Sequence, residues 1–257
     1  MRNFRKHLTE IRARLSPQKR VLLLMDFDGT LSPLADTPEK AQLPQNEQQM
    51  LLRLALQPRI RVAILSGRPL GYLKAAFGAP SFFYGGNHGL EMEGPDFSFR
   101  HPGARALRSV IQNLVRQFWK PIKGVSGALL ENKGLSLAVH YRNVPRAHRP
   151  DFDALVERLQ NKTAGLPVRW RPGNKVWELL PRVAWDKGRA AEALVRHLEH
   201  PFPVAVGDDK TDEVMFKALS KRGITVHVGG GDSFARFYLT RQSEVPRFLR
   251  FLAEVLK

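Results

Sequence analysis

Short apolar runs alternate with segments of helical period at both ends of this chain, and this alternation restricts the fold more than any other feature. Residues 21–25, 61–65 and 202–207 are mostly apolar at successive positions, as in strands that are buried on both faces. Residues 45–57 have the spacing of an amphipathic helix that crosses back between two such strands. Strand, helix and strand in this order predict an α/β core with a parallel sheet.

The middle of the chain follows another pattern. Residues 102–179 contain a helical segment, two strands, a second helical segment and two further strands, with hairpin-like connections instead of crossovers. This αββαββ order predicts a smaller α+β domain, in which two helices back an antiparallel sheet. We therefore expect a core of residues 1–101 and 180–257, with residues 102–179 inserted as a separate domain.

Five aspartates follow two of the core strands. Asp26 and Asp28 come directly after the first strand, one residue apart, and Asp208, Asp209 and Asp212 follow the strand that begins at residue 202. Ligands bind to parallel sheets at the carboxyl ends of their strands, so these side chains are expected at one rim. Helix capping explains one or two of them, but neighbouring carboxylates raise one another's pKa, so the set predicts a bound cation. Hard oxygen ligands of this kind suit Mg²⁺.

Two further segments at the predicted rim suit an anion. Ser66 and Gly67 follow the strand 61–65 and supply a hydroxyl and backbone N–H groups where a helix should begin, although a simple helix cap has the same sequence. Asp186 is a plausible cap for the next helix, and Lys187 then falls in its first turn. A cation at this end is disfavoured by the helix dipole unless an anion lies nearby.

Composition restricts the function classes. The chain has 257 residues, no cysteine and a formal net charge of +17. Without cysteine, disulfides and thiolate chemistry are excluded. The charge suggests an anionic partner, but there is no zinc-finger spacing, RNP-like motif or long basic run typical of nucleic-acid binding. No apolar stretch could span a bilayer, and residues 1–15 are basic without a signal peptide's apolar region, so we expect an amphipathic surface helix there and a cytoplasmic protein.

The motifs together resemble a known family. "DFDGTLSP", "SGR", Lys187 and "GDDKTDE", in this order and spacing, resemble the four motifs of the haloacid dehalogenase superfamily of Mg²⁺-dependent phosphatases. "GGNHGLEMEG", "LENKGLSLAVHYRNV" and "VWELLP" further resemble trehalose-6-phosphate phosphatases. The resemblance implies a Rossmann-like core with an inserted cap domain, and hydrolysis of trehalose 6-phosphate to trehalose and inorganic phosphate through an aspartyl-phosphate intermediate.

The resemblance also implies roles for the rim residues. Asp26 would be the nucleophile, and Asp28 the general acid and then the general base. Mg²⁺ would be held by Asp26, the backbone carbonyl of Asp28 and Asp208, with Asp209 and Asp212 in support. The residues implied to bind the phosphoryl group are Ser66, Gly67, Arg68 and Lys187, of which Ser66 and Lys187 are also counted as catalytic.

The inserted domain is expected to recognise the sugar. The period of two in "LSLAVHYR" places His140 and Arg142 on one face of a strand, and Glu131 and Lys133 share a face if their strand stays extended. A solvated sheet face would show the same pattern, but these residue types suit a polyol. The residues implied to bind the substrate are Asn87, His88, Glu131, Lys133, His140, Arg142 and Glu178.

Two alternatives stay open at this point. The same chemistry could act on another sugar phosphate, such as sucrose phosphate or a glycosyl-phosphoglycerate. A protein of another class could keep the fold without turnover and bind an anion in a regulatory role. The expected partner is a small sugar phosphate, trehalose 6-phosphate, with no nucleic acid and no membrane, and the default oligomeric state is a monomer.

Overall fold

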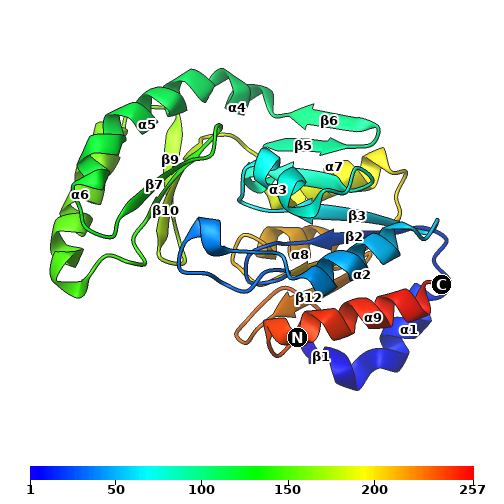
Figure 1. The fold of residues 1–257 in the computed structure, drawn as a ribbon. Helices are drawn as coiled ribbons and strands as arrows, with labels where there is room; N and C mark the ends of the chain where they lie inside the picture. The colour runs from blue at the N-terminus through cyan, green and yellow to red at the C-terminus, as the bar shows by residue number, and fades with distance from the viewer. The chain divides into compact units, whose positions relative to one another are not determined.

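A computed structural model describes residues 1–257, apart from the side chain of Glu39, and the chain divides into two compact units. The core unit contains Met1–Phe99 and Trp185–Lys257, and the inserted unit contains Arg100–Ala184 (Figure 1). The inserted unit is longer at both ends than the predicted 102–179. At its carboxyl end, the last strand runs on to Pro181.

The core unit is built on a nine-stranded sheet with the spatial order β1, β13, β12, β11, β2, β3, β4, β5, β6. In this spatial order, every neighbouring pair from β1 through β13, β12, β11, β2 and β3 to β4 is parallel, and β5 pairs antiparallel to β4. The bounds are β1 Arg2–Asn3, β2 Val21–Met25, β3 Ile60–Leu65, β4 Phe83–Gly86, β5 Glu91–Gly94, β6 Phe97–Arg100, β11 Phe202–Gly207, β12 Ile224–Val228 and β13 Phe237–Leu239. The mainly parallel sheet confirms the predicted α/β class.

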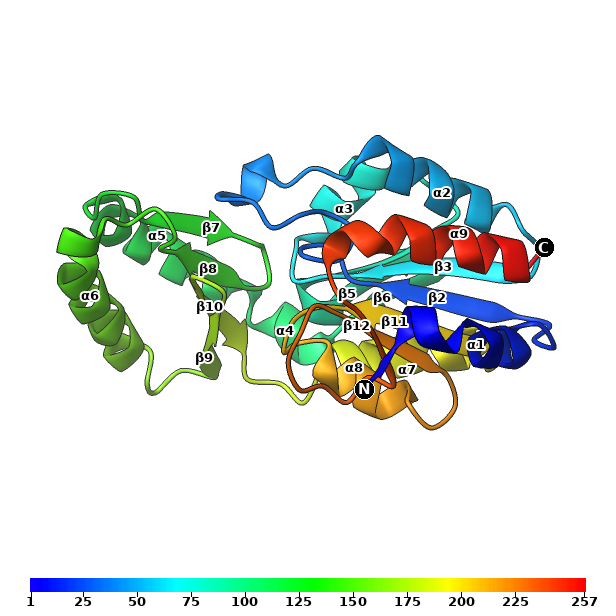
Figure 2. The ribbon, with the colours of Figure 1, turned by 90° about the horizontal axis from the view of Figure 1, so that it is seen from below.

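Helices cover both faces of this sheet (Figure 2). Val21, Leu23 and Met25 of β2 pack into one apolar core with α1, α2, α3 and α9, whereas Leu22 and Leu24 pack into the other with α7 and α8. This is why β2 is apolar at every position. The bounds are α1 Leu8–Leu15, α2 Gln45–Ala55, α3 Leu70–Phe77, α7 Lys187–His197, α8 Glu213–Leu219 and α9 Val245–Val255, with short 3₁₀ turns η1 Phe4–His7, η2 Pro38–Lys40, η3 Asn87–Gly89 and η5 Gln242–Glu244.

The inserted unit has the predicted αββαββ order. Its four strands form an antiparallel sheet with the spatial order β7, β8, β10, β9, and α5 and α6 pack on one face of it (Figure 2). The first helical segment is divided into α4 and α5, and Pro121 lies inside α5. The bounds are α4 Pro102–Ala106, α5 Arg108–Lys123, β7 Leu129–Asn132, β8 Leu137–His140, η4 Arg146–His148, α6 Arg149–Lys162, β9 Val168–Gly173 and β10 Val176–Pro181.

The chain leaves and re-enters the core unit at two aromatic residues in contact. The rings of Phe99 and Trp185 stack with their centroids 4.7 Å apart and their planes inclined by 23°. The indole Nε1 of Trp185 donates a hydrogen bond to the carbonyl oxygen of Gly89, at 2.7 Å. Both ends of the insertion are thereby fixed within the core unit.

The amino-terminal segment forms the predicted amphipathic helix only from Leu8, because β1 and η1 occupy residues 2–7. Ile11 and Leu15 of α1 are fully buried in the core unit, while Arg12 is exposed. Within the part of the chain that the structure describes, no helix has the length and apolar character needed to cross a bilayer.

Candidate active site

The turn after β2 separates the two aspartates of the first motif. Asp26 is buried directly after the strand, and its N–H donates to the carbonyl oxygen of Val206, at 2.9 Å. The chain then turns sharply at Gly29, which has a φ of +85° and donates its N–H to the carbonyl oxygen of Ser32, at 2.7 Å. The turn already includes Phe27 between the two aspartates, whose carbonyl oxygen accepts the N–H groups of Leu31, at 2.9 Å, and Ser32, at 2.8 Å, and Asp26 and Asp28 have different partners.

Asp26 belongs to an acidic cluster at the carboxyl ends of β2 and β11. Carboxylate oxygens of Asp26, Asp208 and Asp212 all lie within 4.8 Å of one another. Lys187, the first residue of α7, places its Nζ 2.6 Å from Asp26 Oδ1 and 2.8 Å from Asp212 Oδ1. Thr30 Oγ1 donates to Asp208 Oδ1, at 2.9 Å. Three segments that are distant in sequence therefore meet at this rim, as the sequence predicts.

The electrostatics of the cluster favour a bound cation. Burial raises the pKa of Asp26, the Lys187 ammonium only partly offsets this, and the other two carboxylates raise it further. Burial and then Asp212 raise the pKa of Asp208 to about 7. Burial acts against the Lys187 ammonium, but Asp212 and Asp26 outweigh it and raise its pKa. Without another cation, the three carboxylates are thus not all ionised at neutral pH.

The donor set fits a divalent metal ion. Three carboxylates and one ammonium leave two negative charges uncompensated when all are ionised. Each carboxylate offers a hard oxygen ligand. A methyl group in place of the Gly29 hydrogen would lie 2.1 Å from Asp208 Oδ2, so only glycine leaves that oxygen in place. The residues present can therefore hold such an ion.

Asp212 and Asp209 were predicted together as supporting residues, but the structure gives them different surroundings. Asp212 is fully buried, and its Oδ2 accepts the N–H groups of Asp208, at 3.1 Å, and Asp209, at 3.0 Å. Asp209 is exposed, and its Oδ1 accepts the N–H of Lys210, at 2.6 Å. The Asp212 side chain therefore fixes the loop after β11, whereas the Asp209 carboxylate lies outside the cluster.

The second motif begins where β3 ends. Ser66 is buried, its N–H donates to the carbonyl oxygen of Gly85, and its Oγ accepts the N–H of Arg68, at 3.2 Å. A Cβ at Gly67 would lie 2.6 Å from Cε1 of His88, so the close approach of these two segments requires glycine. The motif is thus held at the same rim as Asp26.

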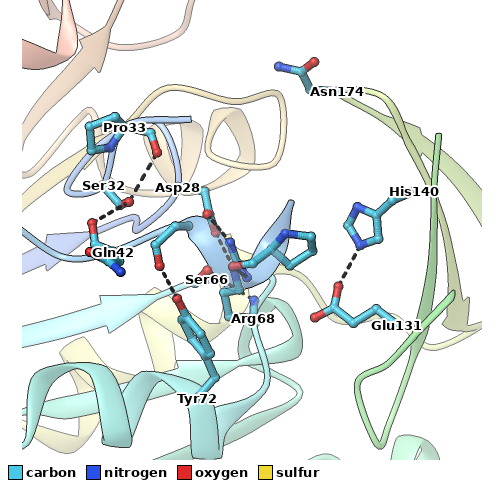
Figure 3. A network of polar contacts seen from close by, with 12 residues as sticks. Asp28, Ser32, Pro33, Gln42, Ser66, Arg68, Tyr72, Glu131, His140 and Asn174 are labelled. Atoms are coloured by element: carbon cyan, nitrogen blue, oxygen red, sulfur yellow. Dashed lines mark hydrogen bonds and ion pairs between the residues drawn. The ribbon is translucent and has the colours of Figure 1, made fainter. Parts of the chain in front are cut away.

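The Arg68 guanidinium forms a bidentate ion pair with Asp28 (Figure 3). Nε lies 2.8 Å from Asp28 Oδ2 and Nη2 lies 2.6 Å from Asp28 Oδ1, while Nη1 donates to the carbonyl oxygen of Pro38, at 2.8 Å. The guanidinium also lies over the ring of Tyr72, 4.8 Å from its centroid. The predicted phosphate-binding role of Arg68 stays a prediction, and its contacts here are to the protein.

Asn87 and His88 occupy the turn η3 after β4. Both have left-handed backbone conformations, with φ values of 49° and 60°. Asn87 is fully buried, and its Nδ2 donates to Glu91 Oε1, at 2.9 Å. The backbone N–H groups of Asn87 and His88 donate to the carbonyl oxygens of Arg68 and Ser66, each at 2.8 Å. These contacts brace the second motif, and a substrate contact for either residue stays a prediction.

Three of the predicted sugar-binding residues, Glu131, His140 and Glu178, lie on one face of the sheet of the inserted unit. The strand β7 does not stay extended to Lys133, because it ends at Asn132, but the Lys133 side chain still reaches Glu178. His140 Nε2 lies 2.8 Å from Glu131 Oε2 (Figure 3), and Lys133 Nζ lies 2.8 Å from Glu178 Oε1. Arg142 differs from the prediction, because β8 ends at His140 and Arg142 lies in the following turn. There it donates to the Asn174 carbonyl oxygen, at 3.3 Å, and Oδ1, at 3.2 Å.

Arg171 is a member of this group that the sequence analysis does not identify. Its Nη2 lies 2.5 Å from Glu178 Oε2. The alternation in "VRWRP" puts Arg169 and Arg171 on one face of β9, but it does not say which residue of β10 lies opposite. The observed register pairs Arg171 with Glu178 and Arg169 with Leu180.

Known proteins resemble this chain over most of its length. The profile of a family described as trehalose-phosphatase matches residues 24–238. Trehalose-phosphate phosphatase B of Arabidopsis thaliana is 31% identical over 255 residues, which cover 92% of this chain and 67% of the plant protein.

Solved structures share the fold. The carboxyl-terminal domain of trehalose-6-phosphate phosphatase from C. albicans superposes with a TM-score of 0.81 at 22% identity, covering 96% of both chains. A haloacid dehalogenase-like hydrolase from Bacteroides thetaiotaomicron superposes with a TM-score of 0.62 at 16% identity, covering 90% of this chain and 99% of that one. The fold is therefore that of haloacid dehalogenase-like hydrolases with an inserted unit. Together with the family match and the plant relative, the four motifs at the rim show that this chain belongs to the trehalose-phosphatase family.

Proposed function

We propose that this chain hydrolyses trehalose 6-phosphate to trehalose and inorganic phosphate, with Mg²⁺ as its cofactor. The observation that carries the proposal is the position of Asp26, a buried carboxylate held by Lys187 within the acidic cluster at the end of β2. The names of the plant and fungal relatives supply the substrate. A cytoplasmic location and a monomeric state stay predictions.

Three groups would hold the metal ion. They are the carboxylates of Asp26 and Asp208 and the backbone carbonyl of Asp28, while Asp212 orients the loop that carries Asp208. When bound, Mg²⁺ supplies positive charge that neutralises the phosphoryl oxygens and the carboxylates. Its selection over other divalent ions rests on the hard oxygen ligands.

The first half of the reaction moves the phosphoryl group to Asp26. A carboxylate oxygen of Asp26 attacks phosphorus, the bond from phosphorus to the sugar O6 breaks, and Asp28 gives its proton to that oxygen. Ser66 and Lys187 position the phosphoryl oxygens. The Asp28 carboxylate paired with Arg68 carries no proton, so it has to leave the guanidinium and take up a proton from solvent before it can donate to the leaving oxygen.

The second half releases phosphate. A water molecule attacks phosphorus, Asp28 takes one of its protons, and the bond between phosphorus and the Asp26 oxygen breaks. Asp26 is thereby regenerated as a carboxylate and Asp28 as an acid. Phosphoryl transfer depends mainly on position and charge neutralisation, which this buried set of charged groups provides.

The test is a panel of phosphate monoesters. The purified protein with Mg²⁺ should release phosphate from trehalose 6-phosphate with a higher kcat/KM than from sucrose phosphate, a glycosyl-phosphoglycerate or glucose 6-phosphate. EDTA and Asp26→Asn should each abolish the release, and added Mg²⁺ should restore only the EDTA-treated wild type. Preference for another sugar phosphate would overturn the substrate, and turnover that survives EDTA would overturn the metal.

A further inference from the structure

Glu178 is a buried carboxylate with a cationic partner on each oxygen. Glu178 is only 8% exposed. Its Oε1 accepts a hydrogen bond from Lys133 Nζ, at 2.8 Å, and its Oε2 accepts one from Arg171 Nη2, at 2.5 Å. A buried carboxylate is costly unless it is paired and hydrogen-bonded. Lys133 and Arg171 together therefore balance the charge of this carboxylate and hold it in one position.

Strand register places four of the residues in one row. Glu131 of β7 pairs with Ala138 of β8, Ala138 pairs with Glu178 of β10, and Glu178 pairs with Arg171 of β9. The next residues along β8 and β10, Leu137 and Leu179, point to the opposite face of the sheet and pack with α5 and α6. The row thus lies on the face without helices, where the methyl group of Ala138 separates two carboxylates.

Lys133 is shared between these carboxylates. Its Nζ lies 2.8 Å from Glu178 Oε1 and 3.9 Å from Glu131 Oε2. Arg171 pairs with Oε2 of Glu178, so the Lys133 ammonium can stay close to Glu131 as well as to Glu178. If Arg171 were removed, Glu178 would lose one of these two cations, and Lys133 would shift toward Glu178 and away from Glu131.

We propose that Arg171 is a positioning residue for sugar recognition, which acts by fixing Glu178 and thereby Lys133. This inference rests on the proposed function, since it assigns Arg171 to the binding of the sugar part of the substrate and not to the chemistry at Asp26. A site that hydrogen-bonds hydroxyl groups discriminates only while its polar groups are held in place. Arg171 contributes that restraint from the outer strand.

The experiment compares Arg171→Gln with Arg169→Gln. Arg169 lies two residues earlier on the same strand, is exposed, and pairs with Leu180. Each variant is assayed with trehalose 6-phosphate and with p-nitrophenyl phosphate, which has no sugar hydroxyl groups. Arg171→Gln should lower kcat/KM for trehalose 6-phosphate about tenfold, mainly through KM, and leave p-nitrophenyl phosphate unchanged, because a hydrogen bond to a charged group is lost. Arg169→Gln should change neither.

Other outcomes overturn the proposal in distinguishable ways. An equal loss for both substrates would mean a merely structural role. If Arg171 positions Glu178, Arg171→Lys, which keeps the charge, should recover part of the selectivity that Arg171→Gln loses. If Arg171→Gln keeps the wild-type ratio of the two kcat/KM values with no loss for either substrate, Arg171 has no positioning role, and the proposed function is unaffected. If the wild type cleaves p-nitrophenyl phosphate but no sugar phosphate, the proposed function fails and the role of Arg171 fails with it.

Discussion

A methyl group added at Gly29 should weaken metal binding, although no ligand residue is changed. Gly29 has a φ of +85°, and a Cβ there would lie 2.1 Å from Asp208 Oδ2. An L-residue in the left-handed region costs about 1–2 kcal/mol. The Asp208 carboxylate must also move and lose the hydrogen bond from Thr30, which adds about 1.5–3 kcal/mol for a charged acceptor. We expect Gly29→Ala to lower the free energy of unfolding by about 3 kcal/mol.

Gly78→Ala is the matched control. Gly78 ends α3 with a φ of +60°, and no atom lies within 4 Å of its Cβ position. Its cost should be the backbone term alone, about 1 kcal/mol. Urea denaturation in EDTA measures the stability of both variants, and calorimetric titration with Mg²⁺ measures affinity. Gly29→Ala should bind Mg²⁺ at least tenfold more weakly, and Gly78→Ala as the wild type does. Equal stability losses with unchanged affinity in both variants would refute the position assigned to Asp208.

Three further predictions follow from the same rim. Because the pKa of Asp208 is raised from 3.8 to about 7, its contribution to the stability of the metal-free protein is lost as the pH rises through 7. Mg²⁺ must displace the Asp208 proton below pH 7, so the apparent Kd for Mg²⁺ should fall up to tenfold for each pH unit on going up to pH 7. Calorimetry from pH 5.5 to 8 that shows a constant Kd would contradict this. Lys187→Met leaves Asp26 buried without its ammonium partner and should destabilise the metal-free protein by about 3–5 kcal/mol in urea denaturation, where a loss below about 1 kcal/mol would argue against the buried pair. Arg68→Ala removes the ion pair that Asp28 has to break, so the rate of trehalose 6-phosphate hydrolysis relative to that of p-nitrophenyl phosphate, whose leaving group needs no proton, should rise about tenfold; an unchanged ratio would exclude a link to the general acid.

The core was predictable from the sequence because buried parallel strands are apolar at every position. Strand β2 coincides with the predicted residues 21–25, and β3 begins one residue before the predicted 61–65. The pair β5 and β6 does not show this signal, since "EMEG" and "FSFR" keep polar side chains that are partly exposed. Strands at this end of the sheet are specified by pairing with a neighbour, which the local sequence does not record.

The site was predictable in its residue types and less so in its pairings. The carboxyl ends of parallel strands bring Asp26 and Asp208 together whatever the details of the loops. The ion pair between Asp28 and Arg68 depends on where the chain turns after β2, and the contact from Arg171 to Glu178 depends on strand register. Periodicity alone encodes neither.

The stacked rings of Phe99 and Trp185 make the insertion an exchangeable module. Because the rings that flank it are in contact, residues 100–184 form an insertion whose two ends lie close together. The entropic cost of closing such an insertion depends only weakly on its length. A change in its length or sequence leaves β2, which ends next to Asp26, and α7, which begins at Lys187, within the core unit. On the proposed function, the sugar that is recognised could then change while the groups that transfer the phosphoryl group stay the same.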